Sequence, residues 1–531
     1  MLADGGAERL SALLRRTLLD RPGEPVTGWL LDLAALHGLA PLRADEVRAV
    51  GDGAPLWRYL HGIGLPPRGE PRSPYEKLLL DLLGGGGSAP RAEPVDGPAV
   101  VQSMLIGGTG RPGEGASGGL GVFLRSLGDA LADRADVGRV VTVVLAANPT
   151  ALVVERAADR EHWTVHVPVD SPVALDQREM GGHRAAITWW LRELLSRHGL
   201  VPDVVHVRYS DDGSLAVADA ARLLGARVVF TLTPDPHRHL AARYPEEGSD
   251  VDALRFDLHR VRVADRLVGR ADTLVAIGGR GDELLEHFPQ LEHRHAVAIE
   301  EGIAPLAGTA RPALVRELFE PSRVFPRLDD SARGLPVLLN VGRLHPVKQQ
   351  AVLVRAWLEA GLHRSTALVL IGGSVTDRTP DEQAVLDEVL ALAASVPGSR
   401  GRLAVLPAWP NTKVRELEHT LVQAVLAPSP HVYACASAKE EFGIAVLEAM
   451  EAGMLVVGPR TGGLPHYVDH GRNGFLADTS TAEGLGDALR EVVALGDATR
   501  AVADAGRETV RERFPIARVA GAFARVYLDL A

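Results

Sequence analysis

Two series of short apolar runs, separated by amphipathic stretches, constrain the fold of this chain more than any other feature. The first series comprises residues 100–106, 140–145, 204–207, 228–231, 273–277 and 296–299, and the second comprises residues 337–341, 367–371, 403–406, 432–435 and 455–457. Buried strands that alternate with helices predict parallel sheets covered on both faces. The sequence therefore predicts two doubly wound α/β halves, which bind ligands at the carboxyl ends of their strands.

The rest of the chain divides around these two halves. The first 83 residues have apolar positions at helical spacing and predict a helical N-terminal appendage, and residues 84–98 are a linker by their Gly and Pro content. We expect residues 99–310 to form the first α/β domain, 311–515 the second, and 516–531 a closing helix. The appendage shows no chemistry, so self-association, regulation and partner binding all stay open for it.

Composition limits the class of protein. With 57 basic and 68 acidic residues, the formal net charge of −11 argues against nucleic acid as a partner. The single cysteine, Cys435, excludes an intramolecular disulfide and a cysteine-based zinc site. No apolar stretch approaches the roughly 18 residues of a membrane span, and no secretion signal is visible, so we expect a cytoplasmic protein without an integral membrane segment.

Two cations follow the first strand of the second half. Gly342 and Arg343 come directly after the apolar run, and Lys348 is expected to open the next helix. An arginine fork, a lysine point charge and the amide groups of a helix N-terminus suit a diphosphate that gains charge as it leaves. The alternative is a solvated loop with two surface cations.

A second motif lies about a hundred residues further on. Glu440 precedes a Phe442-Gly443-Ile444 turn, and Glu448 follows inside the predicted helix. The glycine lets backbone amides approach a ligand closely, while the two carboxylates suit its hydroxyl groups. Taken singly, each glutamate is more often an N-cap or an exposed helix residue.

Three weaker signals accompany these motifs. The Ser117–Gly121 turn feeds a predicted helix and suits an anion, or is only a tight turn. Gly462-Gly463-Leu464 offers backbone donors, or only a turn. Asp235, His237 and His239 follow a strand and suit acid–base chemistry, but no third ligand has convincing metal spacing, so we expect no metal.

The motifs together resemble the retaining glycosyltransferases of family 4, whose GT-B fold has two facing Rossmann-like domains. The resemblance rests on Gly342-Arg343 with Lys348, on Glu440 to Glu448, and on the Gly462-Gly463-Leu464-Pro465 string. Residues 202–213 and the Ser117-Gly118-Gly119 turn resemble the sucrose synthase and sucrose-phosphate synthase branch.

The resemblance implies a role for each candidate residue. Arg343, Lys348 and Glu440 would act at the reacting centre, the first two on the donor diphosphate and the third on the donor sugar. The donor would also contact Gly342, Phe442, Gly443, Ile444, Glu448, Gly462, Gly463 and Leu464. The acceptor and phosphates would face Gly118, Gly119, Leu120, His206, Asp211, Thr233 and His237.

The implied function is transfer of a sugar from a nucleoside-diphosphate sugar, by default a UDP-sugar, to a hydroxyl of a sugar, a sugar phosphate or a small natural product, without any required cofactor. Glu441, His466 and Thr233 depart from the family pattern, which usually has Gly, Glu and His there. These departures keep two alternatives open. One is a GT-B relative with phosphorylase or epimerase chemistry, and the other is a catalytically silent protein that binds nucleotide-sugar as a regulatory or scaffold module.

Overall fold

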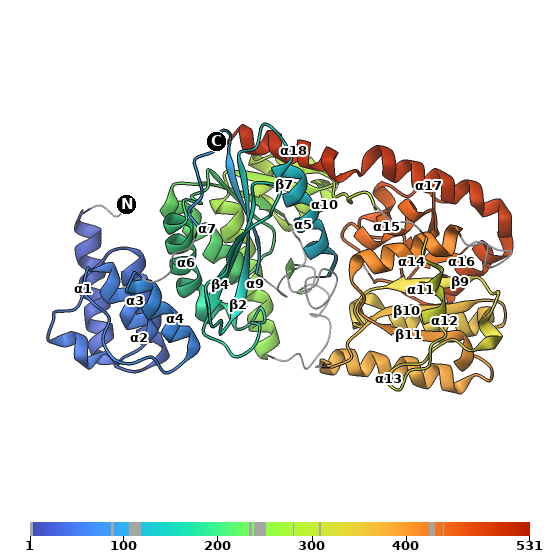
Figure 1. Cartoon of the computed structure of the whole chain (residues 1–531), viewed down its shortest axis with the longest axis horizontal. Helices are drawn as coiled ribbons and strands as arrows, with labels where there is room; N and C mark the ends of the chain where they lie inside the picture. The colour runs from blue at the N-terminus through green and yellow to red at the C-terminus, as the bar shows by residue number, and fades with distance from the viewer. Residues whose placement is uncertain are drawn as a thin grey trace.

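The computed structural model describes residues 4–85, 90–105, 118–232, 236–237, 240, 251–279, 281–306, 310–376, 378–423, 431–438 and 440–531. Three bodies follow one another along the long axis of the molecule: a small helical unit, then two sheet-containing domains (Figure 1). The predicted site residue Thr233 and the candidates Asp235 and His239 lie outside the described residues, as do Ser117 and Lys439.

The first large domain is built on an eight-stranded sheet in the order β3-β4-β2-β1-β5-β6-β7-β8, parallel except for β3. Its strands are β1 (Ala99–Met104), β2 (Arg139–Ala147), β3 (Val154–Arg156), β4 (His162–Val169), β5 (Val204–Val207), β6 (Arg227–Thr231), β7 (Thr273–Ile277) and β8 (Ala296–Ile299). Its helices are α5 (Gly118–Ala132), α6 (Met180–Arg197), α7 (Asp212–Leu224), α9 (Val251–Arg270) and α10 (Gly281–His287). Every side chain of β1 and β5 is buried, as are most of those of β2, β4 and β6, whereas the edge strands β3 and β8 are mostly not, as expected for a sheet covered on both faces at its centre.

The second large domain has a six-stranded parallel sheet in the order β11-β10-β9-β12-β13-β14. Its strands are β9 (Val337–Val341), β10 (Ala367–Gly373), β11 (Leu403–Pro407), β12 (Val432–Ala434), β13 (Leu455–Pro459) and β14 (Phe475–Ala477). Its helices are α11 (Pro312–Glu317), α12 (Gln350–Glu359), α13 (Pro380–Ser395), α14 (Asn411–Gln423), α15 (Ile444–Ala452), α16 (Ala482–Leu495) and α17 (Arg500–Arg513). In both sheets the chain reverses its direction of winding next to the first strand, and ligands bind at such a switch point.

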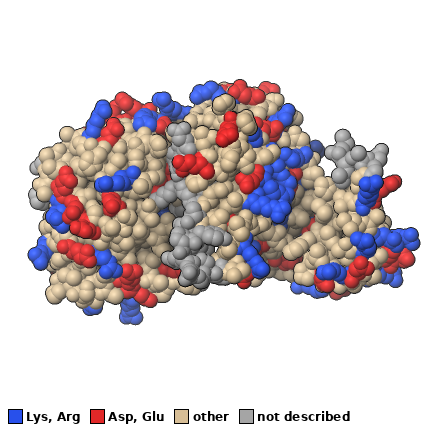
Figure 2. Space-filling view, turned by 180° about the vertical axis from the view of Figure 1, so that it is seen from behind, with Lys and Arg blue, Asp and Glu red and all other residues tan. Residues whose placement is uncertain are grey.

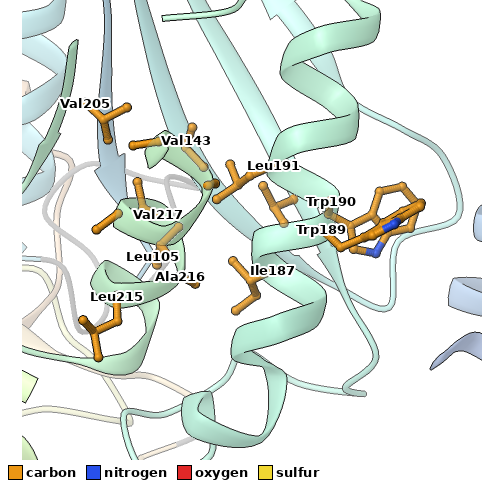
Figure 3. Packing of buried hydrophobic residues seen from close by; sticks show 14 of the residues in the cluster. Leu105, Val143, Ile187, Trp189, Trp190, Leu191, Val205, Leu215, Ala216 and Val217 are labelled. Carbon is orange, nitrogen blue, oxygen red and sulfur yellow. The ribbon is translucent and has the colours of Figure 1, made fainter. Parts of the chain in front are cut away.

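The N-terminal unit consists of α1 (Asp4–Asp20), α2 (Pro25–Leu36), α3 (Ala54–Gly62) and α4 (Pro74–Leu83). It packs on helix α6, which has buried side chains on two opposite faces (Figure 3). Ile187 and Leu191 point toward the sheet, whereas Trp189 and Trp190 point to the opposite side. There the hydroxyl of Tyr75 accepts a hydrogen bond from the Trp190 indole at 2.9 Å, so the appendage core continues into the core of the neighbouring domain.

The last helix, α18 (Ile516–Leu528), returns from the second domain and packs on α5 of the first. Its return path touches the other crossing between the domains. Ile303 donates to the Phe514 carbonyl at 2.9 Å, and Ile516 donates to the Ile303 carbonyl at 2.9 Å. The two inter-domain crossings therefore lie side by side and are hydrogen-bonded to each other.

Eleven predicted strands are present near their predicted positions, and three elements were missed: β3, β4 and β14. Helices α3, α9, α10, α11, α14 and α17 were also not predicted. No helix among the described residues is both long and apolar enough to cross a membrane. On the face that Figure 2 shows, basic and acidic side chains are mostly interspersed, apart from one compact group of basic side chains right of its centre.

Candidate active site

The loop after β9 presents the two predicted cations. Gly342 and Arg343 leave the strand, and the Gln350 side-chain amide holds the loop by donating to the Arg343 carbonyl at 2.8 Å. The expectation that Lys348 opens the next helix was wrong. Lys348 ends a short 3₁₀ turn (Pro346–Lys348), and Gln349, with a left-handed φ of 52°, separates that turn from α12. The break turns Lys348 away from the helix axis and toward the cleft.

Lys348 meets the second motif directly. Its ammonium lies 2.8 Å from Oε2 of Glu440, and the Ser437 hydroxyl donates to the same oxygen at 2.9 Å. Burial opposes the charge of Lys348, but the Glu440 carboxylate outweighs it and raises the pKa of the lysine. Residues 92 positions apart are thus joined at one point, which is the meeting of cation and acid that the two motifs predicted.

Gly462 and Gly463 act behind this point. The Gly463 amide donates to the Glu440 carbonyl at 2.8 Å. A Cβ added at Gly462 would lie 2.4 Å from the Glu440 carbonyl oxygen, and one added at Gly463 would lie 2.0 Å from that of Glu441. Real Cβ atoms do not approach so closely, so the two glycines let one backbone support the other. Neither they nor Leu464 lie among the residues that line the cleft.

The Phe442-Gly443-Ile444 turn leads into helix α15. Gly443 is the N-cap residue, with φ of 92°, a conformation that favours glycine. The Tyr467 hydroxyl donates to the Phe442 carbonyl at 2.7 Å and fixes the turn from behind. Gly443, Ile444 and Ala445 therefore line the cleft on a rigid support, at a helix N-terminus whose amide groups suit an anion.

Glu448 lies one turn further along α15 and is 5% exposed. Its carboxylate accepts a hydrogen bond from the Asn411 amide at 2.8 Å. Burial raises the pKa of Glu448 to about 6, against the opposing effects of Arg415 and Asn411. It lines both the main cleft and an adjoining cavity of about 510 Å³ that extends between α5 and the start of α14.

The main cleft is a cavity of about 390 Å³ between the two large domains. The second domain contributes Gly342, Arg343, Lys348, Glu440, Phe442, Gly443, Ile444 and Glu448, all of them predicted site residues. The first domain contributes Gly119 and Leu120, which follow Gly118 at the start of α5. A Cβ at Gly119 would lie 3.5 Å from that of Ile444, so the two domains approach closely here.

Three predicted acceptor residues do not lie on the wall of this cavity. His206 uses both ring nitrogens, which lie 2.7 Å from the Tyr527 hydroxyl and 2.7 Å from that of Thr231. Asp211 caps α7 by accepting from the Ser214 amide at 2.7 Å. His237 packs against Phe288, with ring centroids 4.6 Å apart. All three side chains contact other parts of the protein. The contact of His206 with Tyr527 holds α18 onto the sheet.

Several residues of the cavity wall were not predicted, among them Arg208, Glu301, Trp409 and Asn411. Arg208 and Glu301 come from the ends of β5 and β8, and a strand-end position was the one signal that pointed to them. Burial raises the pKa of Glu301 to about 7, the carboxylates of Glu441 and Glu440 add to this rise, and the Arg208 charge opposes it. Among the described residues, no group of three or more His, Cys, Asp or Glu side chains is arranged to hold a metal ion.

The fold is shared with proteins of known structure. Sucrose-phosphate synthase from Thermosynechococcus elongatus superimposes with a TM-score of 0.63 at 19% identity, over 81% of this chain and 98% of that one. Anabaena HepE, solved in complex with UDP and glucose, superimposes with a TM-score of 0.55 at 18% identity, over 81% of this chain and 99% of that one. Two facing parallel-sheet domains with a site between them define a GT-B protein.

The family follows from the sequence of the second domain. Residues 329–509 match the model described as "Glycosyl transferases group 1", so this part of the chain is a group 1 glycosyltransferase domain. The D-inositol 3-phosphate glycosyltransferase of Corynebacterium glutamicum (strain R) is 25% identical over 393 residues, which is 71% of this chain and 84% of that protein. The predicted relation to family 4 glycosyltransferases and the predicted GT-B fold are both confirmed.

Proposed function

We propose that the protein transfers a sugar from a nucleoside-diphosphate sugar to a hydroxyl acceptor, with retention of anomeric configuration. The observation that carries this proposal is the cleft wall on which Arg343, Lys348, Glu440 and the amides of residues 442–444 meet. A diphosphate requires cations and amide donors, and a sugar requires a hydrogen-bonding carboxylate. Family membership of the second domain supports the same assignment.

The donor fits the wall in one direction. Its diphosphate lies at Arg343 and Lys348, its sugar at Glu440, and its ribose at Glu448, where the adjoining cavity receives the base. HepE is a GT-B relative that was solved with UDP, which supports a uridine donor. The other assigned donor and acceptor contacts, a cytoplasmic location and the bounds of the five predicted segments stay predictions.

The chemistry needs no group on the protein that forms a covalent bond to the sugar. The bond between the anomeric carbon and the diphosphate breaks, and its electrons leave with the phosphate oxygen. The acceptor hydroxyl attacks from the same face, and a leaving-group oxygen takes its proton. Arg343 and Lys348 stabilise the charge that develops on the diphosphate, so they bind the transition state more tightly than the ground state.

The test is release of nucleoside diphosphate with UDP-, GDP- and ADP-glucose over an acceptor panel. Arg343→Ala and Lys348→Ala should each lower kcat about a hundredfold, as does loss of one donor to a developing oxyanion. Arg355→Ala removes an exposed cation of the same domain, one that pairs with Glu388, and should leave kcat unchanged. Tight donor binding without release of nucleoside diphosphate would instead indicate a catalytically silent binding protein.

A further inference from the structure

Arg208 is a buried cation with two nitrogen atoms that make no hydrogen bond. It follows strand β5, is 6% exposed, and its Nε and Nη2 atoms are buried without a hydrogen bond. No ion pair joins it to another described residue. The rings of Phe123 and Phe523 lie with their centroids 4.9 Å from its guanidinium carbon, which stabilises the charge but leaves the N–H groups unpaired. A buried guanidinium in this condition is costly unless an anion completes it.

Arg208 lines the main cleft, on the wall that belongs to the first domain. The nearest candidate counter-ion on that wall, Glu301, makes no ion pair with it in the described part of the chain. The proposed donor diphosphate is already provided with Arg343 and Lys348 on the opposite wall. Arg208 therefore faces the place that the second substrate occupies, beside the Thr231 and Glu301 side chains.

We propose that Arg208 binds an anionic group on the acceptor, so that the acceptor is a sugar or polyol bearing a phosphate or a carboxylate. This inference rests on the proposed glycosyl transfer and specifies its acceptor class. The planar guanidinium forms paired hydrogen bonds with such oxyanions. Thr231 and Glu301 then bind hydroxyl groups of the same acceptor, and the anion anchors one end so that a hydroxyl is held at the donor sugar.

The experiment compares acceptors that differ only in charge, each with the donor that binds most tightly in calorimetry. The pairs are glucose with glucose 6-phosphate, glucose with glucuronate, and myo-inositol with its 3-phosphate. The charged member of at least one pair should have the higher kcat/KM, and Arg208→Gln should lower that value about a hundredfold, as truncation of a buried charge pair does. The neutral member should change little, and the phosphate and carboxylate arms identify which anion is preferred.

Two controls separate this effect from damage to the fold. Arg227→Gln makes the same charge change at the exposed amino end of β6 and should leave both members of each pair unchanged. Arg208→Lys keeps the charge but loses the forked guanidinium, and its kcat/KM with the charged acceptor should lie between the values of the wild type and of Arg208→Gln. That second variant also serves if Arg208→Gln does not fold.

Several results would overturn the proposal. One is a preference for neutral acceptors, and another is an equal loss for both members of a pair in Arg208→Gln. Weaker binding of UDP alone to Arg208→Gln would assign the guanidinium to the donor instead. If no donor and acceptor react at all, the proposed function fails, and calorimetry with glucose 6-phosphate in saturating UDP still decides: binding that requires Arg208 supports the anion site, and no binding rejects it.

Discussion

Lys348 and Glu440 bind each other at 2.8 Å, yet each is also a group that the proposed donor needs. A diphosphate must draw Lys348 away from Glu440, and a sugar hydroxyl must then take the place of the ammonium. The ion pair is thus a competitor of the ligand. Since both side chains are partly exposed, the pair contributes about 1 kcal/mol or less.

Glu440→Gln should therefore tighten binding of UDP, which has no sugar, by a few-fold, because about 1 kcal/mol corresponds to about fivefold in Kd. The same variant should lower kcat with the full donor, because the sugar loses a charged partner. Calorimetry and initial rates check the two halves. Glu317→Gln breaks a similar pair with Lys413 outside the cleft and should do neither; weaker UDP binding to Glu440→Gln would contradict the competition.

Glu301 links the cleft to pH. Its pKa of about 7 lies above the ordinary value of 4.5, so the folded protein holds this proton more tightly than the unfolded chain does. Stability therefore falls as pH rises from about 4.5 to about 7. Glu301→Gln lacks this loss and should be more stable than the wild type at pH 8, by on the order of 1–2 kcal/mol, but not at pH 4.5.

Thermal unfolding of both proteins at the two pH values measures this difference. Exposed Glu320→Gln makes the same change in net charge and should give the same Tm difference at both pH values. An effect of Glu301→Gln that does not depend on pH would show that the carboxylate does not titrate in this range.

At the scale of elements, the cleft depends on two loops that support each other. The loop that carries Glu440 rests on the Gly462-Gly463 backbone, whose approach leaves no room for a Cβ. The pair of glycines is visible in the sequence. The contact that it makes cannot be read there, because its partner lies more than twenty residues away. The resemblance implies that these glycines contact the donor, and in the structure they lie behind the Glu440 carbonyl.

Gly463→Ala should displace this loop and lower both stability and activity. Its φ of −82° suits alanine, so the whole effect comes from the added Cβ, which meets the Glu441 carbonyl at 2.0 Å. Overpacking of this kind costs about 1–3 kcal/mol. Urea unfolding and kcat measure the two effects. Gly269→Ala, where no atom lies within 4 Å, is the matched control, and equal behaviour of the two variants would contradict the contact.

Helices and strands differed in how far the sequence predicts them. The strands of the two sheets were recognisable as apolar runs because both faces of each sheet are covered. Strand β4 was missed because His162, Thr164 and His166 interrupt its apolar positions, and α9 because its exposed face is rich in arginine. Likewise, Arg208 stood out only through its burial, its two aromatic neighbours and its missing partner, none of which a sequence displays.

At the scale of the molecule, the appendage shares a core with the first domain instead of hanging from its linker. The Tyr75 hydroxyl, buried at that junction, accepts from Arg58 Nη1 at 2.7 Å and from the Trp190 indole at 2.9 Å. A stable junction makes the appendage and the domain a single unfolding unit. Its possible role in self-association stays a prediction.

Tyr75→Phe leaves those two buried donors without an acceptor and should lower the free energy of unfolding by about 2–6 kcal/mol, at about 1–3 kcal/mol for each unpaired group. Circular dichroism and tryptophan fluorescence should report one shifted transition, because both bodies unfold together. Tyr59→Phe removes a single 3.3 Å bond from the Leu42 amide inside the appendage and should cost less. Two separate transitions would show that the appendage unfolds independently.

The hydrogen-bonded pairing of the two inter-domain crossings at Ile303 has a mechanical consequence. Two connecting segments that are hydrogen-bonded to each other form a pivot, so we expect the domains to rotate about it more easily than they slide past each other. Such a rotation would change the gap between the Arg208 guanidinium on one wall and the Lys348 ammonium on the other. Only a donor and an acceptor that together span this gap would contact both walls at once, so the rotation of the domains would select substrates by their combined length.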